Sequence, residues 1–361
     1  MIGRSESARA KGPSMATITI GLDLAKSVFQ VHGVDVQGNV TIRRQLRRSD
    51  MHKFFAKLPP CLIGMEACGT SHYWARELTK LGHTVKQMPA EYVKAYRKRS
   101  KTDPADAEAI CEAVTRPRIP EVPTKTVAQQ TATMPHKARD QFVGMRTALS
   151  NMIRSLMAEF GIIAAAGEKG VETLLAIVVD ETRNELSAAQ RAPLMAAAAS
   201  LAEINASIDR VDAMILAHAK SCDMAKRLKT LPGVGAHMAS AFAATVTAPT
   251  AFPSGRAFAA SLGLTPKISG TGGEVMLGSI TKRGNGYLRR MLYLGAAARL
   301  SYAARCPDKA DPALVAVLAR MPFRKAAIRL ANKMARVIWA LMVRGGTYIE
   351  KHLPTVRAAT A

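Results

Sequence analysis

The sequence has few acidic residues for its size and no long hydrophobic run. Of its 361 residues, 51 are Lys or Arg and only 27 are Asp or Glu, which gives a net charge of +24. No apolar stretch approaches the roughly 20 residues of a spanning helix, and no basic N-terminus precedes an apolar signal core. So many positive charges repel one another in a compact fold. We therefore expect a polyanionic partner, and nucleic acid rather than a membrane surface. A basic soluble protein without such a partner is the alternative.

Cysteine is also scarce and follows no recognisable pattern. The five residues are scattered, with no Cys-x-x-Cys pair: Cys61, Cys68, Cys111, Cys222 and Cys306. An odd, unspaced set argues against a disulfide framework and against a zinc site. We therefore expect a protein of the reducing cytosol.

The N-terminal third predicts an α/β domain. Residues 1–16 are small and polar, and we expect a disordered lead. Alternating apolar patterns then predict three successive strands, at 17–25, 28–36 and 40–46, before helices and strands alternate. Three strands in hairpin order followed by such alternation predict a mixed sheet, and we assign this domain to residues 17–125.

Helical patterns dominate the remainder. Residues 116–125 are Pro-rich and predict a linker, and apolar spacing predicts long helices at 129–161 and 201–221. The stretch from residue 223 onward holds 21 of the 51 basic residues but 5 of the 27 acids, and includes a glycine-rich loop before its last helices. We expect three further regions: a helical or coiled-coil arm at 126–222, a helical C-terminal domain at 223–346 and a tail at 347–361.

Four carboxylates stand at positions where chemistry is expected. Asp23 ends the first predicted strand, in "GLDLAK", and Glu66 ends a later one, in "CLIGME". A charge at the end of a buried strand is costly unless it is paired or binds metal, and the carboxyl ends of strands face the ligand crevice in open α/β sheets. Asp103 and Asp106, in "KTDPADA", share one face of a predicted helix start.

Each of these acids also has a structural explanation. Asp103 is a good N-cap, with Pro104 at the first helical position and Asp106 placed to reach back to the cap. Taken together beside a basic chain, however, four hard oxygen donors suit Mg²⁺, which accepts carboxylates together with phosphate oxygens. Two such ions can clamp the attacking and leaving oxygens of a phosphodiester.

The order of these motifs resembles that of a known family. The order is Asp in a first strand, Glu in a later strand and Asp-x-x-Asp on a helix. This order resembles that of the DEDD domain found in insertion-sequence transposases of the one-hundred-and-ten type. That domain has a ribonuclease-H-like fold and is close to Holliday-junction resolvases. The C-terminal "LPGVG", "GLTP", "SGTGG" and "LGSITKRGN" also resemble that family's second domain. The resemblance covers about residues 17–346, and implies that the four acids form a metal-binding tetrad.

The same resemblance implies a serine nucleophile that forms a covalent link to a DNA phosphate. The matching glycine-rich segment reads Ser269-Gly270-Thr271-Gly272, whereas many relatives carry adjacent serines before the glycine pair. Ser269 is the preferred nucleophile because a primary hydroxyl is less hindered. Thr271 is the alternative by position, and Ser279 a distant third. The competing interpretation is a flexible turn whose hydroxyls only cap the backbone.

Several other residues are expected to contact nucleic acid. The segment "LPGVGAHMA" resembles a helix-hairpin-helix element, in which Gly233 and Gly235 would expose backbone N–H groups to phosphate; a plain turn between helices is the alternative. Basic residues flanking these motifs are expected to contact phosphates, which positions the chain without specifying sequence: Lys101, Lys282, Arg283, Arg289 and Arg290. Five bases between Arg324 and Arg336 follow helical spacing and form either a further stripe or a solvated face.

The sequence thus predicts a Mg²⁺-dependent DNA transposase or recombinase. The resemblance further implies a structured guide RNA encoded by the element, the bridge RNA, which pairs with donor and target DNA. It also implies a dimer or tetramer in which the carboxylates of one protomer meet the serine of another. Two alternatives stay open: a structure-selective nuclease that uses water in place of the serine, and a non-catalytic nucleic-acid-binding protein.

Overall fold

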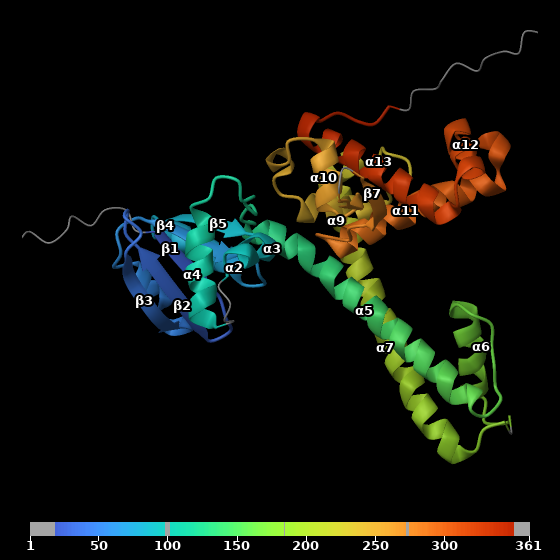
Figure 1. Ribbon diagram of the computed structural model, residues 1–361. Coiled ribbons are helices and arrows are strands. Elements are labelled where there is room, and N and C mark those ends of the chain that lie inside the picture. The colour runs from blue at the N-terminus through green and yellow to red at the C-terminus, as the bar shows by residue number, and fades with distance from the viewer. Residues whose placement is uncertain (1–18, 98–101, 184, 272–273, 350–361) are drawn as a thin grey trace, which may run out of the picture. The chain divides into compact units, whose positions relative to one another are not determined.

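The computed structural model describes residues 19–97, 102–183, 185–271 and 274–349. The predicted lead, Lys101 and all but the first residues of the predicted tail lie outside the described residues. The chain forms two compact units, which divide between Val127 and Ala128 (Figure 1). Within the described ranges, no helix combines the length and the apolar character needed to cross a bilayer.

A five-stranded mixed sheet forms the first unit, in the order β3-β2-β1-β4-β5. Its strands are β1 (Thr19–Asp23), β2 (Val28–Val34), β3 (Val40–Arg47), β4 (Leu62–Glu66) and β5 (Thr84–Met88). The first three pair antiparallel as a meander, whereas β4 and β5 run parallel to β1. The prediction of an α/β domain with a mixed sheet is confirmed.

Helices cover both faces of this sheet. The elements are η1 (Arg48–Asp50), α1 (Met51–Phe55), α2 (Ser71–Lys80), α3 (Ala90–Val93), η2 (Lys94–Tyr96) and α4 (Asp103–Val114). On one face, Phe29 and Phe55 are buried in a single apolar cluster with Trp74 and Leu78 of α2. The opposite face is covered by α4, which buries Ile110 and its neighbours. The core therefore fixes α4 against the sheet.

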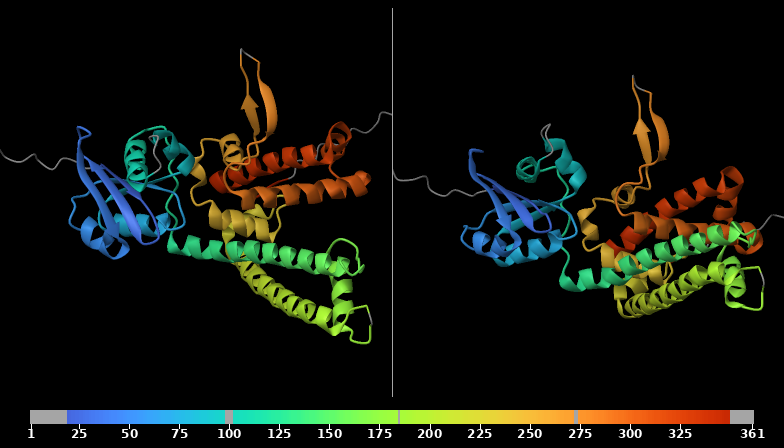
Figure 2. Two further views of the ribbon diagram at one scale, coloured as in Figure 1. Left: turned by 60° about the horizontal axis from the view of Figure 1, so that its bottom comes forward. Right: turned by 90° about the horizontal axis from the view of Figure 1, so that it is seen from below.

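Three helices build the arm of the second unit: α5 (Val127–Ala158), α6 (Glu168–Val179) and α7 (Ala188–Ser221). Figure 2 shows α5 and α7 diverging toward the tip of the arm, where α6 packs with both of them. The predicted amphipathic spacing holds, because Leu201, Ile208 and Ile215 are buried. The α7 helix starts well before the predicted Leu201, because the Ala-rich stretch upstream of it is also helical.

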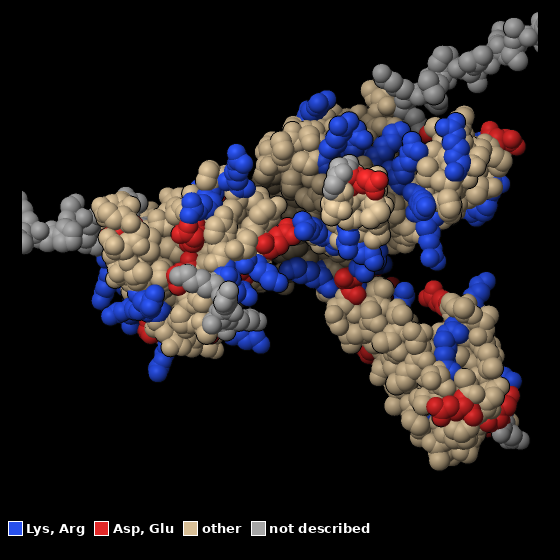
Figure 3. Space-filling view, viewed as in Figure 1, with Lys and Arg blue, Asp and Glu red and all other residues tan. Residues whose placement is uncertain are grey.

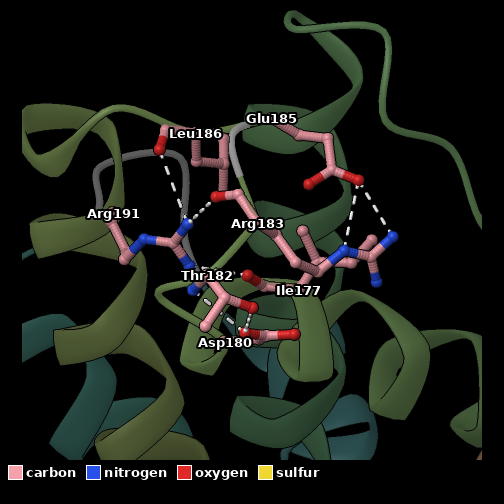
Figure 4. Close-up of polar contacts among 7 residues, drawn as sticks. All are labelled: Ile177, Asp180, Thr182, Arg183, Glu185, Leu186 and Arg191. Atoms are coloured by element: carbon pink, nitrogen blue, oxygen red, sulfur yellow. Dashed lines mark hydrogen bonds and ion pairs between the residues drawn. The ribbon is translucent and has the colours of Figure 1, made fainter.

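Buried Arg191 ties the tip of the arm together. Its guanidinium donates to the carbonyls of Ile177 and Val178 at the end of α6, and to those of Arg183 and Leu186 in the connecting loop (Figure 4). Carbonyls at a helix C-terminus have no partner within the helix, and a cation there also interacts favourably with the helix dipole. One side chain therefore satisfies the end of α6 and sets the path of the loop.

Short and long helices form the remainder of the second unit around one core. They are α8 (Asp223–Leu228), α9 (Ala236–Thr245), η3 (Pro249–Ala251), α10 (Gly255–Ser261), α11 (Gly286–Arg305), η4 (Pro307–Lys309), α12 (Pro312–Arg320) and α13 (Phe323–Arg344). The glycine-rich segment is not only the loop predicted from sequence. It forms an antiparallel hairpin, β6 (Pro266–Ser269) and β7 (Met276–Ile280), that projects from the helices (Figure 2).

A buried chain of polar side chains joins the arm to these helices. Nε2 of His136 on α5 lies 2.8 Å from Oγ of Ser240 on α9, and Nδ1 of His218 on α7 lies 2.8 Å from the same oxygen. Nδ1 of His136 is 3.1 Å from the hydroxyl of Tyr287 on α11. Hydrogen bonds in a water-poor interior demand specific geometry, so this chain fixes where α5 and α7 meet the C-terminal helices.

Candidate functional site

Two of the predicted carboxylates end neighbouring parallel strands. Asp23 is the last residue of β1 and Glu66 the last of β4. The register pairs Leu22 with Met65, so the two acids follow directly at the same end of the sheet. Both are partly exposed, whereas the residues before them are fully buried. The strands therefore deliver two carboxylates to one edge, side by side.

Two glycines allow the other pair of acids to reach this edge. Gly21 of β1 lies opposite Gly64 of β4, and both face α4. A Cβ at Gly21 would lie 2.1 Å from the carbonyl oxygen of Ala107, and one at Gly64 would lie 2.6 Å from Cβ of Val114. Because these strands have no side chain there, α4 packs directly against the sheet. Sequence reasoning missed this role, although both glycines interrupt buried strands, which signals a close backbone approach.

The start of α4 carries Asp103 and Asp106. The predicted capping arrangement is wrong by one residue: Thr102 is the N-cap and Asp103 is already helical, which places Pro104 at the second position. The side chain of Thr102 makes no capping hydrogen bond. Asp103 is exposed and Asp106 half-buried. Neither acid is therefore the cap, and both are available to the edge where β1 and β4 end.

Electrostatic effects show that all four acids share one region. Burial, followed in order by the charges of Asp106, Glu66 and Asp103, raises the pKa of Asp23 to about 6. Burial, followed by the charge of Asp106, also raises the pKa of Glu66. Like charges that raise one another's pKa must be close in space. The fold thus gathers acids that are up to 83 positions apart, from Asp23 to Asp106.

One basic residue stands among these acids. Nε of Arg97 lies 2.5 Å from Oδ1 of Asp106, and its charge lowers the pKa of Glu66 against the other effects. Sequence reasoning missed Arg97, although the basic run Arg97–Lys101 leads directly into the Asp103 motif. A strong cation beside clustered carboxylates partly neutralises their repulsion.

The residues present fit a divalent cation. Oδ1 of Asp106 is buried, and no donor among the described residues has the alignment of a hydrogen bond to it, Arg97 included. Its neighbour Arg97 supplies charge without hydrogen-bond alignment, which leaves the oxygen able to accept a further partner, and hard carboxylate oxygens are the ligands that Mg²⁺ accepts. Across the described ranges, no three His, Cys, Asp or Glu side chains already stand in coordinating positions. Closing the site around a cation therefore requires side-chain movements.

The candidate nucleophiles lie on the projecting hairpin of the second unit. Ser269 is the last residue of β6, paired with Met276, and Thr271 lies in the turn; both are exposed. A Cβ at Gly270 would lie 2.1 Å from the carbonyl oxygen of Glu274, so the turn requires glycine there. Ser279 lies on β7, nearer the helices. Exposed hydroxyls near a tight turn are accessible to a substrate.

Several residues predicted to contact phosphate have partners within the protein. Nη1 of Arg289 donates to the carbonyls of Leu262 and Arg283, and Arg290 pairs with Asp140 while stacking on Tyr287. These arginines hold loops and helices in place. Lys282 and Arg283 flank the turn before α11.

The two glycines of "LPGVG" differ in their surroundings. Gly233 has φ +85°, and a Cβ there would lie 2.8 Å from Cδ of Arg299 and 3.0 Å from the carbonyl oxygen of Gly295. Gly233 is therefore needed for close packing against α11. Gly235 has open space around it and is the N-cap of α9, so its surroundings leave room for a phosphate.

Comparison with known proteins gives consistent matches along the chain. Residues 20–162 match a family described as "Transposase", the DEDD transposases of IS110 type, and residues 225–310 match "Transposase IS116/IS110/IS902 family". A "Probable family 20 transposase" of Pseudomonas aeruginosa is 45% identical over 91% of this chain and 98% of its own length. A "Putative transposase y4pF/y4sB" of Sinorhizobium fredii is 41% identical over 94% of this chain and 88% of its own. The "Transposase for insertion sequence element IS1111A" of Coxiella burnetii is 35% identical over 93% of this chain and 92% of its own length.

Proposed function

This chain belongs to the IS110 family of insertion-sequence transposases, and on that basis we propose that Asp23, Glu66, Asp103 and Asp106 hold a divalent cation, Mg²⁺, for cutting and joining DNA. Members of this family are DNA-processing enzymes. The observation that carries the assignment is the gathering of four acids at one end of a parallel strand pair, where a buried oxygen of Asp106 accepts no hydrogen bond. A ribonuclease-H-like domain at residues 17–125 is part of the same proposal.

Bound Mg²⁺ would polarise a phosphoryl oxygen and stabilise charge that develops on the reacting oxygens. The residues of the chain supply the rest. The strand ends fix Asp23 and Glu66, and α4 presents Asp103 and Asp106 from the side. Arg97 holds Asp106 in the absence of the cation and would release it when the cation binds.

The hydroxyl of Ser269 is the proposed nucleophile, with Thr271 as the alternative and Ser279 third. Its oxygen would attack a phosphorus atom of the DNA backbone, and the bond between that phosphorus and the leaving sugar oxygen would break. The proton would pass from the serine to the leaving oxygen, so that no water is consumed and the phosphodiester energy is kept for rejoining. The support is the exposure of Ser269 and Thr271 on the projecting hairpin.

Partners follow from family membership and charge. DNA is the substrate class, and a bridge RNA is the proposed source of sequence specificity, as pairing supplies it in other RNA-guided systems. The net charge of +24 supports both polyanionic partners. We further propose a dimer or tetramer that combines the carboxylates of one protomer with the serine of another, an arm at residues 126–222, a transposase domain at 223–346, and cytoplasmic, nucleoid-associated localisation.

The test uses full-length protein, DNA that carries the element's ends, and the element's own transcript. The proposal predicts Mg²⁺-dependent strand cleavage and a covalent protein–DNA adduct in wild type, and neither in Asp23→Asn. Ser269→Ala should lose the adduct while Thr271→Ala keeps it; the reverse pattern would move the nucleophile to Thr271. Cleavage that persists without any adduct in both variants would indicate a nuclease that uses water. Unchanged activity in Asp23→Asn would indicate a protein whose carboxylates are not catalytic.

A further inference from the structure

A groove in the C-terminal helices has a lining unlike the rest of the surface. It encloses a cavity of about 890 Å³ between α11, α12, α13 and the base of the β6–β7 hairpin. Its apolar lining includes Leu264, Leu300, Leu314 and Met334, each at most 9% exposed, which form a floor. The side-chain amide of Asn332 donates to the carbonyl of Leu264, so α13 is fixed to the segment that leads into the hairpin.

The rim of this groove is strongly basic. Five exposed bases of α13 line it: Arg324, Lys325, Arg329, Lys333 and Arg336. Among the described residues, none of the five belongs to a salt bridge. The acid in the lining, Asp311, already accepts the backbone N–H of Ala313 as the N-cap of α12. Figure 3 shows Lys and Arg side chains gathered over the C-terminal helices on the face that it presents.

This arrangement lowers the stability of the free protein. Lys325, Arg329 and Lys333 are each four positions apart, and like charges at that spacing repel by roughly 0.2–0.5 kcal/mol per pair. A solvated helix face would show a similar run of charges. Here, however, the basic side chains surround a cavity with a buried apolar floor, whereas a solvated helix face would be convex. A basic rim over an apolar floor is complementary to a ligand that is both anionic and flat.

We propose that this groove binds an unpaired stretch of nucleic acid, with its phosphates on the basic rim formed by α13 and its nucleobases over the apolar floor. The proposal rests on the proposed function for the presence of nucleic acid, and adds where and in which form the protein holds it. A volume near 890 Å³ lies within the roughly 300–1,000 Å³ typical of small-ligand pockets. A few unpaired nucleotides fit such a space, whereas a duplex would keep its bases stacked and away from the floor.

The position of the groove gives the proposal a mechanistic consequence. Pro266, Gly278 and Ser279 line it at the base of the hairpin, and Ser269 lies farther along the same hairpin. Successive strand residues are about 3.3 Å apart, so Ser269 is roughly 10 Å from Pro266. A strand held in the groove would therefore pass close to the candidate nucleophile. The same site accepts unpaired RNA or unpaired DNA, because their phosphate chemistry is shared.

The binding test compares three fluorescently labelled probes by anisotropy: a 12-nucleotide U-tract RNA, a 12-nucleotide T-tract DNA and a 12-base-pair duplex. The full-length variant Arg329→Glu/Lys333→Glu reverses two rim charges. Lys169→Glu/Lys220→Glu makes the same change in net charge at exposed positions of α6 and α7. Circular dichroism verifies that both variants fold, and the milder Arg324→Gln/Arg336→Gln variant provides an independent reading of the rim.

We expect the groove variant to weaken single-strand binding at least tenfold, and the arm variant less than threefold. Two lost phosphate contacts should also reduce the slope of log K against log salt by about 1.4. Tighter binding of the RNA or of the DNA single strand identifies the source, and either result supports the proposal. Equal losses in both charge-reversal variants, a preference for the duplex, or competition by polyglutamate as effective as by the single strands would overturn it.

The outcome is separable from that of the proposed function. If the groove variant binds single strands normally while Asp23→Asn abolishes cleavage, only the groove assignment fails. If the groove variant loses binding while Asp23→Asn cleaves DNA normally, only the carboxylate assignment fails.

Discussion

Nε of Arg97 lies 2.5 Å from Oδ1 of Asp106, so a positive charge already stands beside the candidate metal carboxylates. In a chain without bound cation, this guanidinium offsets part of the repulsion among four acids. The same contact would compete with a metal ion for Asp106. Arg97 therefore links the stability of the free site to its affinity for cations.

Arg97→Gln is expected to lower the melting temperature in EDTA and to enlarge the increase that Mg²⁺ produces. Removal of the competing charge should tighten cation binding about tenfold, which adds roughly 1.4 kcal/mol of stabilisation at saturating Mg²⁺. Thermal unfolding with and without saturating Mg²⁺ measures both effects. Lys94→Gln, an exposed base of η2, is the control. An identical Mg²⁺ response in wild type and Arg97→Gln would refute this role.

Gly21→Ala should disrupt the site by displacing α4 from the sheet. The new methyl group would lie 2.1 Å from the carbonyl oxygen of Ala107, so α4 must shift away from the sheet. Such overpacking costs roughly 1–3 kcal/mol, and because α4 carries Asp103 and Asp106, cation binding should weaken as well. Gly69→Ala is the control, since that glycine lies just after β4 and has open space around it. Denaturation and Mn²⁺ titration of both variants distinguish this effect from a general loss of stability.

His136 should make the second unit sensitive to acid. Burial, followed by nearby positive charge, lowers the pKa of His136 to about 4. Its unfolded value is near 6.5, so the unfolded chain takes up a proton first as the pH falls. The contribution of neutral His136 to the free energy of unfolding is fully present above pH 6.5 and decreases as the pH falls toward 4, with a loss of about 2 kcal/mol by pH 5. Calorimetry at pH 7.5 and 5 should show a larger loss in wild type than in His136→Gln, whereas His52→Gln should behave as wild type.

Arg191→Met should loosen the arm tip without unfolding the chain. The substitution leaves buried carbonyls at the end of α6 without a donor, which costs about 1–3 kcal/mol per unsatisfied group. Hydrogen exchange across residues 168–190 should accelerate, while that of the C-terminal helices stays unchanged. Arg183→Ala removes only an exposed pair with Glu185 (Figure 4), which is worth less than about 1 kcal/mol. Similar hydrogen exchange in Arg191→Met and wild type would show that the loop keeps its conformation without the Arg191 hydrogen bonds.

Much of the first unit could be predicted because local pattern and tertiary environment agree there. Strand alternation located β1 and β4, and a charge after a buried run singled out Asp23 and Glu66. The role of Gly21 and Gly64 could not be read in the same way, because it depends on which face meets α4. Arg97 was missed because its ion pair with Asp106 is a tertiary contact, and a basic run alone does not indicate its partner.

The hairpin of the second unit shows the opposite case. The glycines of this segment predicted a loop. Its two strands bury neither face, so they lack the alternation of apolar and polar residues that predicts a strand: Ile268 is 73% and Met276 66% exposed. The groove also escaped prediction. Helical spacing did identify the basic residues of α13, but an apolar floor to which three other segments also contribute cannot be inferred from one helix. Whether charges form a solvated face or a rim is decided by packing.

The most direct test of the central claim, that four separate acids converge on one divalent-cation site, is a count of bound Mn²⁺ by electron paramagnetic resonance. The account predicts about one or two ions per wild-type chain, binding weakened at least tenfold in Asp23→Asn and in Asp106→Asn, and unchanged binding in Asp35→Asn, whose exposed carboxylate serves its own turn. Wild-type binding that survives both substitutions intact, or no bound Mn²⁺ at millimolar concentration, would contradict it.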